Sequence, residues 1–153
     1  MAGFSGGCAC GRIRYECSEG PIVQVICHCR DCQRASGSAS AAILVVASDR
    51  LKFSGSEPKY HEVKAESGRT MRRGFCSECG SPLSIRRPET LRIEFLQAAS
   101  LDDPSMFVPK FEVWVSSAHP WHQLHPDTQK FDRGPSAEVR APIEAYFAAR
   151  AKV

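Results

Sequence analysis

The sequence lacks any apolar run long enough to span a bilayer. Its longest uninterrupted apolar stretch, Ala41–Ala47, has seven residues, whereas a transmembrane helix needs about 20. The first ten residues also lack the basic start and the apolar core of a secretory signal. We therefore expect a cytoplasmic protein with no membrane partner.

A strong excess of charge of one sign is absent too. Twenty Lys and Arg residues face 17 Asp and Glu residues, a formal net charge of +3. Net charge alone therefore does not make this a polyanion-coating protein. Hydrophobic residues make up 42% and charged residues 24% of the chain, which is ordinary for a folded domain and excludes general disorder. We find no internal repeat and no low-complexity segment, and 153 residues suffice for one domain with a real core.

Long helical periodicity is scarce, whereas short alternating segments are common. Ile13 and Tyr15 alternate with polar neighbours, and so do Leu91, Ile93 and Phe95, as expected for half-buried strands. Glycine and proline separate these segments at short intervals, which is typical of a mainly β, antiparallel domain. Further predicted strands are Val23–Ile26, Ala41–Val46, Leu51–Phe53, Tyr60–Val63, Met71–Phe75, Leu83–Ile85 and Val113–Val115.

Two helical segments are expected. Asp31–Ala35 suits a short helical turn, and Pro142 suits the first position of a C-terminal helix. That helix would bear side chains at helical spacing, namely Ile143, Tyr146, Phe147 and Arg150. We therefore divide the chain into a β domain, residues 1–133, and a C-terminal linker with a short helix packed on the same domain, residues 134–153.

Cysteine is the residue in excess, and seven of the eight cysteines form three clusters. The clusters are Cys8 and Cys10; Cys27, Cys29 and Cys32; and Cys76 and Cys79. In an extended chain, residues two apart point to the same side, so each C-x-C pair can present two sulfurs to one ion. A C-x-x-C turn followed by Gly80 is typical of structural zinc sites, because glycine adopts the positive φ that such a turn needs.

Counting ligands predicts two zinc ions per chain. Cys8, Cys10, Cys76 and Cys79 make a closed set of four thiolates, the pattern of a structural zinc. Cys27, Cys29 and Cys32 then remain together. Three protein ligands with one open position are the pattern of a catalytic or substrate-binding zinc.

Other interpretations of the cysteines stay open. An even count permits four disulfides, and buried free thiols or a redox-sensing trio are further alternatives. Disulfides are disfavoured, however, in a reducing cytoplasm. The 43 residues between Cys32 and Cys76 exceed the spacing of nucleic-acid zinc ribbons, which argues against a nucleic-acid partner. Cys17 stands alone and is expected to be a small buried hydrophobe.

Several other residues are interpreted from their position. His28 should point away from the ion held by its neighbours and is expected to be structural. Asp103 before Pro104 is typical of a helix N-cap. Substrate-binding residues are expected directly after the three-cysteine cluster, at Arg34, Ser36 and Gly37.

The motifs together resemble one known family. They are the segments Gly6–Tyr15, Cys27–Gly37, Gly74–Leu83 and Ser100–Pro104, followed by Pro120-Trp121. In this order they are similar to the glutathione-dependent formaldehyde-activating enzymes, a family that includes centromere protein V. The resemblance extends from Gly6 to about Asp132. The chain departs from the family pattern at Ala9, where the family often has a histidine or a polar residue, and at Glu112, where many relatives carry a histidine.

The resemblance implies a fold and an activity. The fold would be a zinc-stapled, twisted β structure of the Mss4-like (β-tent) type. Cys27, Cys29 and Cys32 would be the catalytic residues and hold the active-site zinc, while the other four clustered cysteines would hold the structural zinc. The activity would be that of a carbon–sulfur lyase, forming or cleaving S-hydroxymethylglutathione. Its partners would be a small thiol such as glutathione and an aldehyde such as formaldehyde.

The three-thiolate site also suggests how such a reaction would proceed. A zinc ion with three thiolates carries a formal charge of −1, and it favours a soft anionic fourth ligand such as a thiol that has lost its proton. The bound thiolate would then add to an aldehyde carbon. The alternative hypothesis is a zinc-stapled binding module without turnover, which would not need a metal with an open position.

Overall fold

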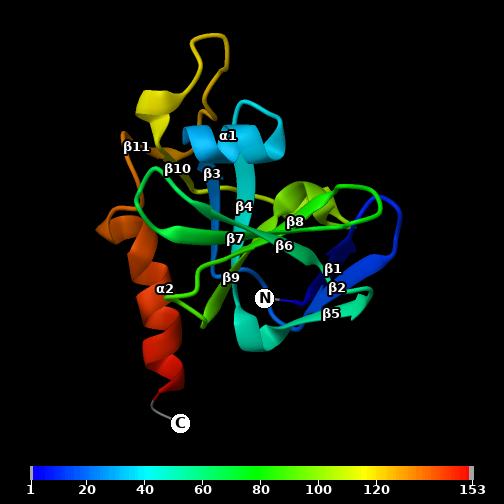
Figure 1. Ribbon diagram of the computed structural model, residues 1–153. Helices are drawn as coiled ribbons and strands as arrows, with labels where there is room; N and C mark the ends of the chain where they lie inside the picture. Colours follow the sequence, from blue (N-terminus) through cyan, green and yellow to red (C-terminus); the bar gives the residue numbers. More distant parts are fainter. Residues whose placement is uncertain (1, 152–153) are drawn as a thin grey trace.

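The computed structural model describes residues 2–151, which form a mainly β structure with two helices (Figure 1). The strands are β1 (Phe4–Gly7), β2 (Ile13–Cys17), β3 (Val23–Cys27), β4 (Ala41–Ala47), β5 (Leu51–Gly55), β6 (Lys59–Lys64), β7 (Thr70–Phe75), β8 (Pro82–Arg86), β9 (Ile93–Gln97), β10 (Phe111–Val113) and β11 (Gln129–Phe131). The α-helices are α1 (Arg30–Ser36) and α2 (Ala137–Arg150). Short 3-10 turns are Ser48–Arg50, Ala98–Ser100, Pro104–Met106 and Val115–Ser117.

The strands form two sheets. Three strands pair in the order β1-β2-β5, and eight pair in the order β11-β10-β3-β4-β9-β8-β7-β6. In Figure 1 the small sheet lies beside the large one, α1 lies across the upper end of β3 and β4, and α2 runs down the left side. No helix among the described residues is both long and apolar enough to cross a membrane.

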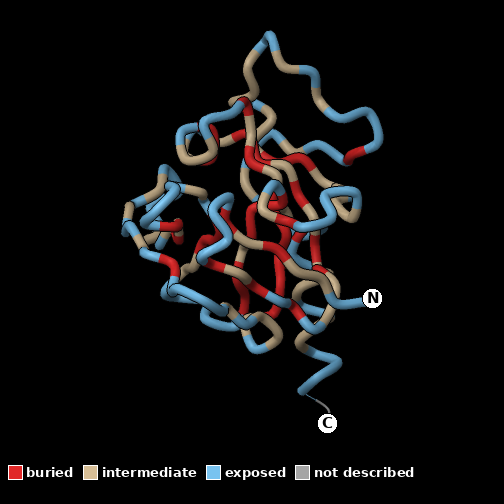
Figure 2. The backbone as a smooth tube through the Cα atoms, turned by 90° about the vertical axis from the view of Figure 1, so that its right-hand side faces the viewer, coloured by how far each residue is buried: buried red, intermediate tan, exposed pale blue. Residues whose placement is uncertain are grey.

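The mainly β fold class is confirmed, with one departure from an antiparallel arrangement. β10 runs parallel to both of its neighbours, β3 and β11. A parallel pair needs a crossover connection of about a dozen residues or more. Residues 114–128, between β10 and β11, supply one. This connection projects from the top of the molecule in Figure 2, largely exposed.

Alternation along the strands creates a core on each face of the large sheet. The first core packs against the small sheet and includes Leu44 and Leu96, which pair across β4 and β9. The second core lies on the opposite face and includes the adjacent pair, Val45 and Phe95. That second core is covered by α2, whose Val139 is buried in it, with Ile143 and Phe147 packed against it. These cores appear as the buried runs through the centre of Figure 2.

Some expected element bounds were wrong. Leu91, expected in a half-buried strand with Ile93 and Phe95, is 76% exposed and precedes β9, which begins at Ile93. The strand predicted at Val113–Val115 ends at Val113, because Trp114 adopts a left-handed conformation with φ of 61°. Helix α2 begins at Ala137 rather than at Pro142, which lies inside the helix. The predicted cap is confirmed: the Asp103 carboxylate accepts a hydrogen bond from the Ser105 backbone N–H, 3.0 Å away, with Pro104 at the start of the turn.

Gly6 lies in strand β1, where the chain passes very close to its neighbours. A Cβ atom built on Gly6 would lie 2.3 Å from both the Ser100 carbonyl oxygen and the Tyr15 hydroxyl oxygen. Tyr15 is fully buried. No side chain fits at this position without moving backbone, so the glycine is required by packing.

Gly6→Ala should therefore lower the free energy of unfolding by about 1–3 kcal/mol, the usual cost of overpacking. Gly68→Asn is the matched control. Gly68 has a φ of 78° and open space around it, and asparagine tolerates that conformation. Denaturant unfolding of both variants checks this, and equal stability of Gly6→Ala and the wild type would contradict the packing argument.

Candidate metal centres

The four-cysteine cluster joins two turns that are far apart in the sequence. Cys8 and Cys10 lie in the turn after β1, and Cys76 and Cys79 lie in the turn between β7 and β8. Gly80 closes the second turn with a φ of 73° and donates its N–H to the Cys76 carbonyl oxygen at 2.9 Å. The sequence prediction for this turn is confirmed.

The sulfur positions fit a tetrahedral ion. The Sγ atoms of Cys8 and Cys10 are 3.5 Å apart, and those of Cys10 and Cys76 are 3.7 Å apart. Zinc–sulfur bonds of about 2.3 Å in a tetrahedron place the sulfurs about 3.8 Å apart. All four ligand atoms lie within 4.8 Å of one another. The four thiols therefore have the geometry that a tetrahedral metal site with four sulfur ligands requires.

Nearby donors stabilise thiolates in this cluster. The Ile13 N–H donates to Cys8 Sγ at 3.2 Å, and the Ser81 hydroxyl lies 3.2 Å from Cys79 Sγ. Hydrogen bonds from the side chain and the backbone of Ser81 lower the pKa of Cys79 to about 5. Such donors are the usual supporting contacts of metal ligands.

The second cluster is assembled by one short stretch of chain. Cys27 ends β3, Cys29 is the N-cap of α1, and Cys32 lies in the first turn of that helix. The three Sγ atoms lie within 4.8 Å of one another. Cys27 and Cys32 are buried, whereas Cys29 is partly exposed. One side of the cluster is therefore accessible, unlike a site closed by four protein ligands.

The three thiols do not titrate alike. Hydrogen bonds from Cys27 and Cys32 lower the pKa of Cys29 to about 3, and the Cys32 N–H, 3.4 Å from Cys29 Sγ, adds to this. The hydrogen bond with Cys29 and burial raise the pKa of Cys27. The pKa of Cys32 is raised to about 12. The hydrogen bond with Cys27 and the positive charge of Arg73 act to lower this pKa, but the hydrogen bond with Cys29 and burial outweigh them.

The residues predicted to bind substrate lie on α1 or just after it. Arg34 is exposed. The Ser36 hydroxyl lies 3.0 Å from the Ser40 carbonyl oxygen, and Gly37 ends the helix in a left-handed conformation with φ of 66°. Ser36 and Gly37 thus have a structural role at the end of α1, and a role in substrate binding stays a prediction for all three. Cys17 is buried in the first core and belongs to neither cluster.

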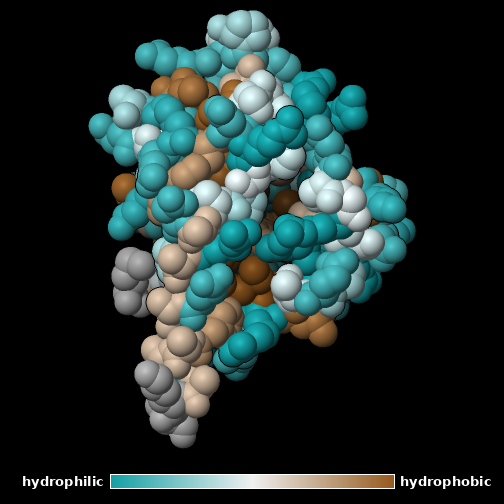
Figure 3. Space-filling model, turned by 90° about the vertical axis from the view of Figure 1, so that its left-hand side faces the viewer, coloured by the Kyte–Doolittle hydropathy of each residue, from teal (hydrophilic) through white to brown (hydrophobic). Residues whose placement is uncertain are grey.

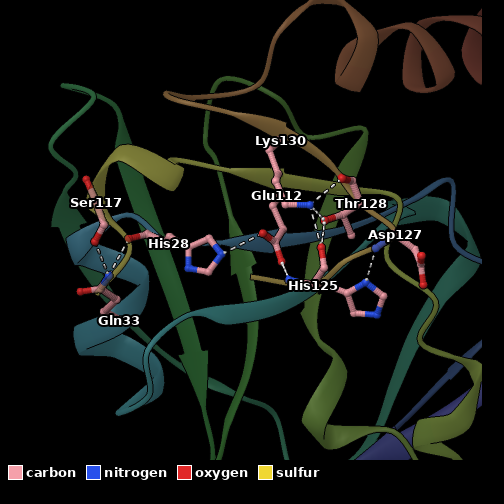
Figure 4. A network of polar contacts seen from close by, with 8 residues as sticks. All are labelled: His28, Gln33, Glu112, Ser117, His125, Asp127, Thr128 and Lys130. Atoms are coloured by element: carbon pink, nitrogen blue, oxygen red, sulfur yellow. Dashed lines mark hydrogen bonds and ion pairs between the residues drawn. The ribbon is translucent and has the colours of Figure 1, made fainter. Parts of the chain in front are cut away.

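His28 is fully buried in a polar network that the sequence analysis did not foresee (Figure 4). Its Nε2 lies 3.6 Å from Oε2 of Glu112, a carboxylate that is only 1% exposed. Glu112 Oε1 accepts the His125 N–H at 2.8 Å. On the other side, Gln33 donates to the carbonyl oxygens of His28, at 2.7 Å, and of Ser117, at 3.0 Å.

This network fixes the 114–128 connection beside the three-cysteine cluster. Burial lowers the pKa of His28 although Glu112 acts in the opposite direction, so the histidine is held neutral in the interior. The connection also reaches α1, because Nε2 of His119 lies 3.1 Å from the Arg30 guanidinium, and Trp121 stacks on the His119 ring at 4.6 Å. The sequence carried one signal for the buried His28–Glu112 pair, namely an acidic residue, Glu112, between the apolar residues Phe111 and Val113.

The two cysteine clusters are the metal-ligand groups found within residues 2–151. The loop histidines His119, His122 and His125 belong to neither group.

A family model matches most of the chain. The model for the glutathione-dependent formaldehyde-activating enzyme matches residues 3–117, which include both cysteine clusters. The chain belongs to this family. Its mainly β architecture, with two cysteine clusters, is accordingly Mss4-like.

One solved structure is also similar to this chain. The structure is similar to the crystal structure of a Rhodobacter sphaeroides protein, with 19% sequence identity and a TM-score of 0.49. That match covers 64% of this chain and 87% of the other. No curated protein matches the chain.

This family member should bind up to two zinc ions per chain, and the two sites should differ in chelator resistance. The four-thiolate site has one more protein ligand and no exchangeable position, so it should retain its metal longer. Metal analysis of reduced protein before and during dialysis against a chelator checks this. Fewer than one zinc per chain, with disulfides instead, would contradict both assignments.

Single cysteine variants should separate structural from functional metal. Cys79→Ser should lower the melting temperature by on the order of 10 °C, because a structural zinc contributes folding free energy directly. Cys29→Ser should leave the melting temperature within a few degrees of the wild type and release the second zinc. Thermal melts with metal analysis measure both effects, and equal destabilisation by the two substitutions would refute the division.

Proposed function

We propose that this protein is a zinc-dependent carbon–sulfur lyase that joins a small thiol to an aldehyde, or cleaves the adduct. S-hydroxymethylglutathione, made from glutathione and formaldehyde, is the model adduct. One observation carries the proposal: three thiols converge at Cys27, Cys29 and Cys32, next to solvent, while a complete four-thiol site lies elsewhere. Membership of the formaldehyde-activating family supports the same reaction.

The residues present suit a zinc ion with an open position. Bound by three thiolates, zinc would stabilise a fourth, external thiol as its thiolate at neutral pH. The partial exposure of Cys29 leaves access for such a ligand. Thiol ligands also require a reducing environment, so we propose the cytoplasm as the site of action.

The chain itself holds this geometry rigid. β3 pairs with β4 on one side and with β10 on the other, which fixes Cys27. The His28 N–H donates to the Val113 carbonyl oxygen at 3.0 Å, and the Gln33 side chain holds the His28 carbonyl oxygen. The backbone on both sides of Cys29 is therefore fixed, and a reacting thiol would meet a preorganised site.

The reaction is an addition without redox change. The thiol loses its proton, its sulfur attacks the aldehyde carbon, and a carbon–sulfur bond forms as the carbonyl π bond breaks. The oxygen takes up one proton, so that thiol plus aldehyde gives the hydroxyalkyl thioether with all atoms retained. Placing the two reactants together accounts for the acceleration that the site would provide.

Cobalt substituted for zinc tests thiol binding directly, because its visible spectrum depends on ligand type and number. Glutathione should change the spectrum of the wild-type protein at the three-cysteine site. It should not do so in Cys29→Ser, which keeps the four-cysteine site as an internal reference. Formaldehyde added next should form the adduct faster than it forms in buffer at equal thiol concentration.

The outcomes distinguish the lyase from its alternative. A spectral change without rate enhancement would refute catalysis and support a thiol-binding module. A response to a different small thiol, but not to glutathione, would replace the substrate. No response to any thiol would refute the proposed function.

A further inference from the structure

The hairpin formed by β6 and β7 is an edge of the large sheet, yet its turn touches helix α1. This helix connects β3 to β4, and three further strands lie between β4 and β6. Nevertheless, the Glu66 N–H in the turn of the hairpin donates to the Asp31 carboxylate on α1 at 2.8 Å. In Figure 1 the turn lies at the left, close to the start of α1. The twisted sheet thus curls until its edge hairpin meets this helix.

The contact falls on the part of α1 that carries two of the three clustered cysteines. Cys29 is the N-cap of α1, and Asp31 lies between it and Cys32 in the first turn of the helix. One helical turn spans 3.6 residues, so the hairpin turn, residues 65–69, lies against the same turn of helix as Cys29. Cys29 is the partly exposed member of the cluster. The hairpin therefore borders the accessible side of the candidate metal centre.

The outer part of this hairpin is held less firmly than the rest of the sheet. β7 pairs with β8 from Arg72 onward, so residues 63–71 extend beyond β8 as a two-stranded ribbon with its turn. Two strands without a third are only marginally stable in water. Among residues 2–151, the bond from Glu66 to Asp31 is the one hydrogen bond between the hairpin and α1. The position of the turn therefore depends on that bond.

The turn has a fixed shape of its own and room to move. The Ala65 N–H donates to the Arg69 carbonyl oxygen at 2.9 Å, and the Gly68 N–H donates to the Ala65 carbonyl oxygen at 2.8 Å. Residues 66–69 are exposed. Figure 3 shows this side of the molecule, where hydrophilic side chains cross a hollow with an apolar floor beside α2. The turn can therefore leave α1 as a unit when the bond to Asp31 breaks.

We infer that residues 65–69 form a flap over the three-cysteine cluster, and that Asp31 is the positioning residue that holds this flap closed. The flap controls how fast ligands reach the open position of a metal ion bound there, as surface loops do over other sites. Asp31 acts through the backbone of Glu66 and does not bind the metal. This inference goes beyond the proposed function, because it requires a metal ion at the cluster but neither a particular thiol nor turnover.

Zinc release measures the flap directly. Zinc-loaded protein is mixed with an excess of the coloured chelator 4-(2-pyridylazo)resorcinol, and the three-cysteine site should lose its metal in the faster of two phases. Asp31→Ala should accelerate this phase by about fivefold or more, as expected for loss of a hydrogen bond to a charged group. The slower phase, from the four-cysteine site, should stay unchanged and is the internal reference.

Three further variants separate the hydrogen bond from other effects. Asp31→Asn loses the same charge but keeps an oxygen that can accept the Glu66 N–H, so its rate should stay within about twofold of the wild type. Glu66→Pro removes the donor and leaves α1 untouched, and it should accelerate release as Asp31→Ala does. Asp103→Ala removes a carboxylate that caps a backbone N–H in a different turn, and it should change neither phase.

Amide hydrogen exchange shows whether the flap itself moves. Residues 65–69 should exchange faster in Asp31→Ala than in the wild type or in Asp31→Asn, at an unchanged melting temperature. Equal release rates for Asp31→Ala and Asp31→Asn would reduce the effect to charge and overturn the inference, and so would a wild-type rate in Glu66→Pro.

The same measurements keep the flap and the proposed function apart. If the release rates respond as expected while no thiol changes the cobalt spectrum, the flap stands and the lyase is refuted. If thiols bind but the release rates of all variants match the wild type, the flap is refuted and the proposed function stands. If the three-cysteine cluster holds no metal, both fail.

Discussion

The four-cysteine cluster is the interaction on which the rest of the structure depends. It links the turn after β1, in the small sheet, to the turn between β7 and β8, in the large one. Cys8 and Cys76 are buried in the first core, which packs the two sheets together, while Cys10 and Cys79 are exposed. A single metal ion there would hold the two sheets together. The backbones of Gly6 and Leu101 also pair nearby.

The second cluster is built differently. Its three cysteines come from one turn between β3 and α1, so local geometry brings them together. What surrounds them is long-range: the 114–128 connection is tied to α1, because the Gln33 side chain donates to the Ser117 carbonyl oxygen. The two clusters can therefore have different roles. If the four-cysteine cluster links the two sheets, the three-cysteine cluster can leave one coordination position of its metal free without loss of the fold.

Local rules predicted the parts of the site that depend on spacing. The C-x-C and C-x-x-C-G patterns identified both thiol sets, and the cap at Asp103 followed from its position before proline. Parallel pairing of β10 escaped prediction, since alternation in a three-residue strand does not specify direction. Pro142 was misplaced because helix α2 is held by tertiary packing of Val139, one turn before the proline. The contact between His28 and Glu112 escaped prediction because it joins residues far apart in sequence.

Zinc K-edge X-ray absorption of the fully loaded protein, with and without glutathione, tests the central claim most directly. One site with four sulfurs and one with three give an average of about 3.5 sulfurs per zinc at about 2.3 Å. The account predicts that glutathione raises this average to about 4, as its sulfur replaces a lighter ligand at the three-cysteine site. An average that stays at its starting value with saturating thiol would contradict it.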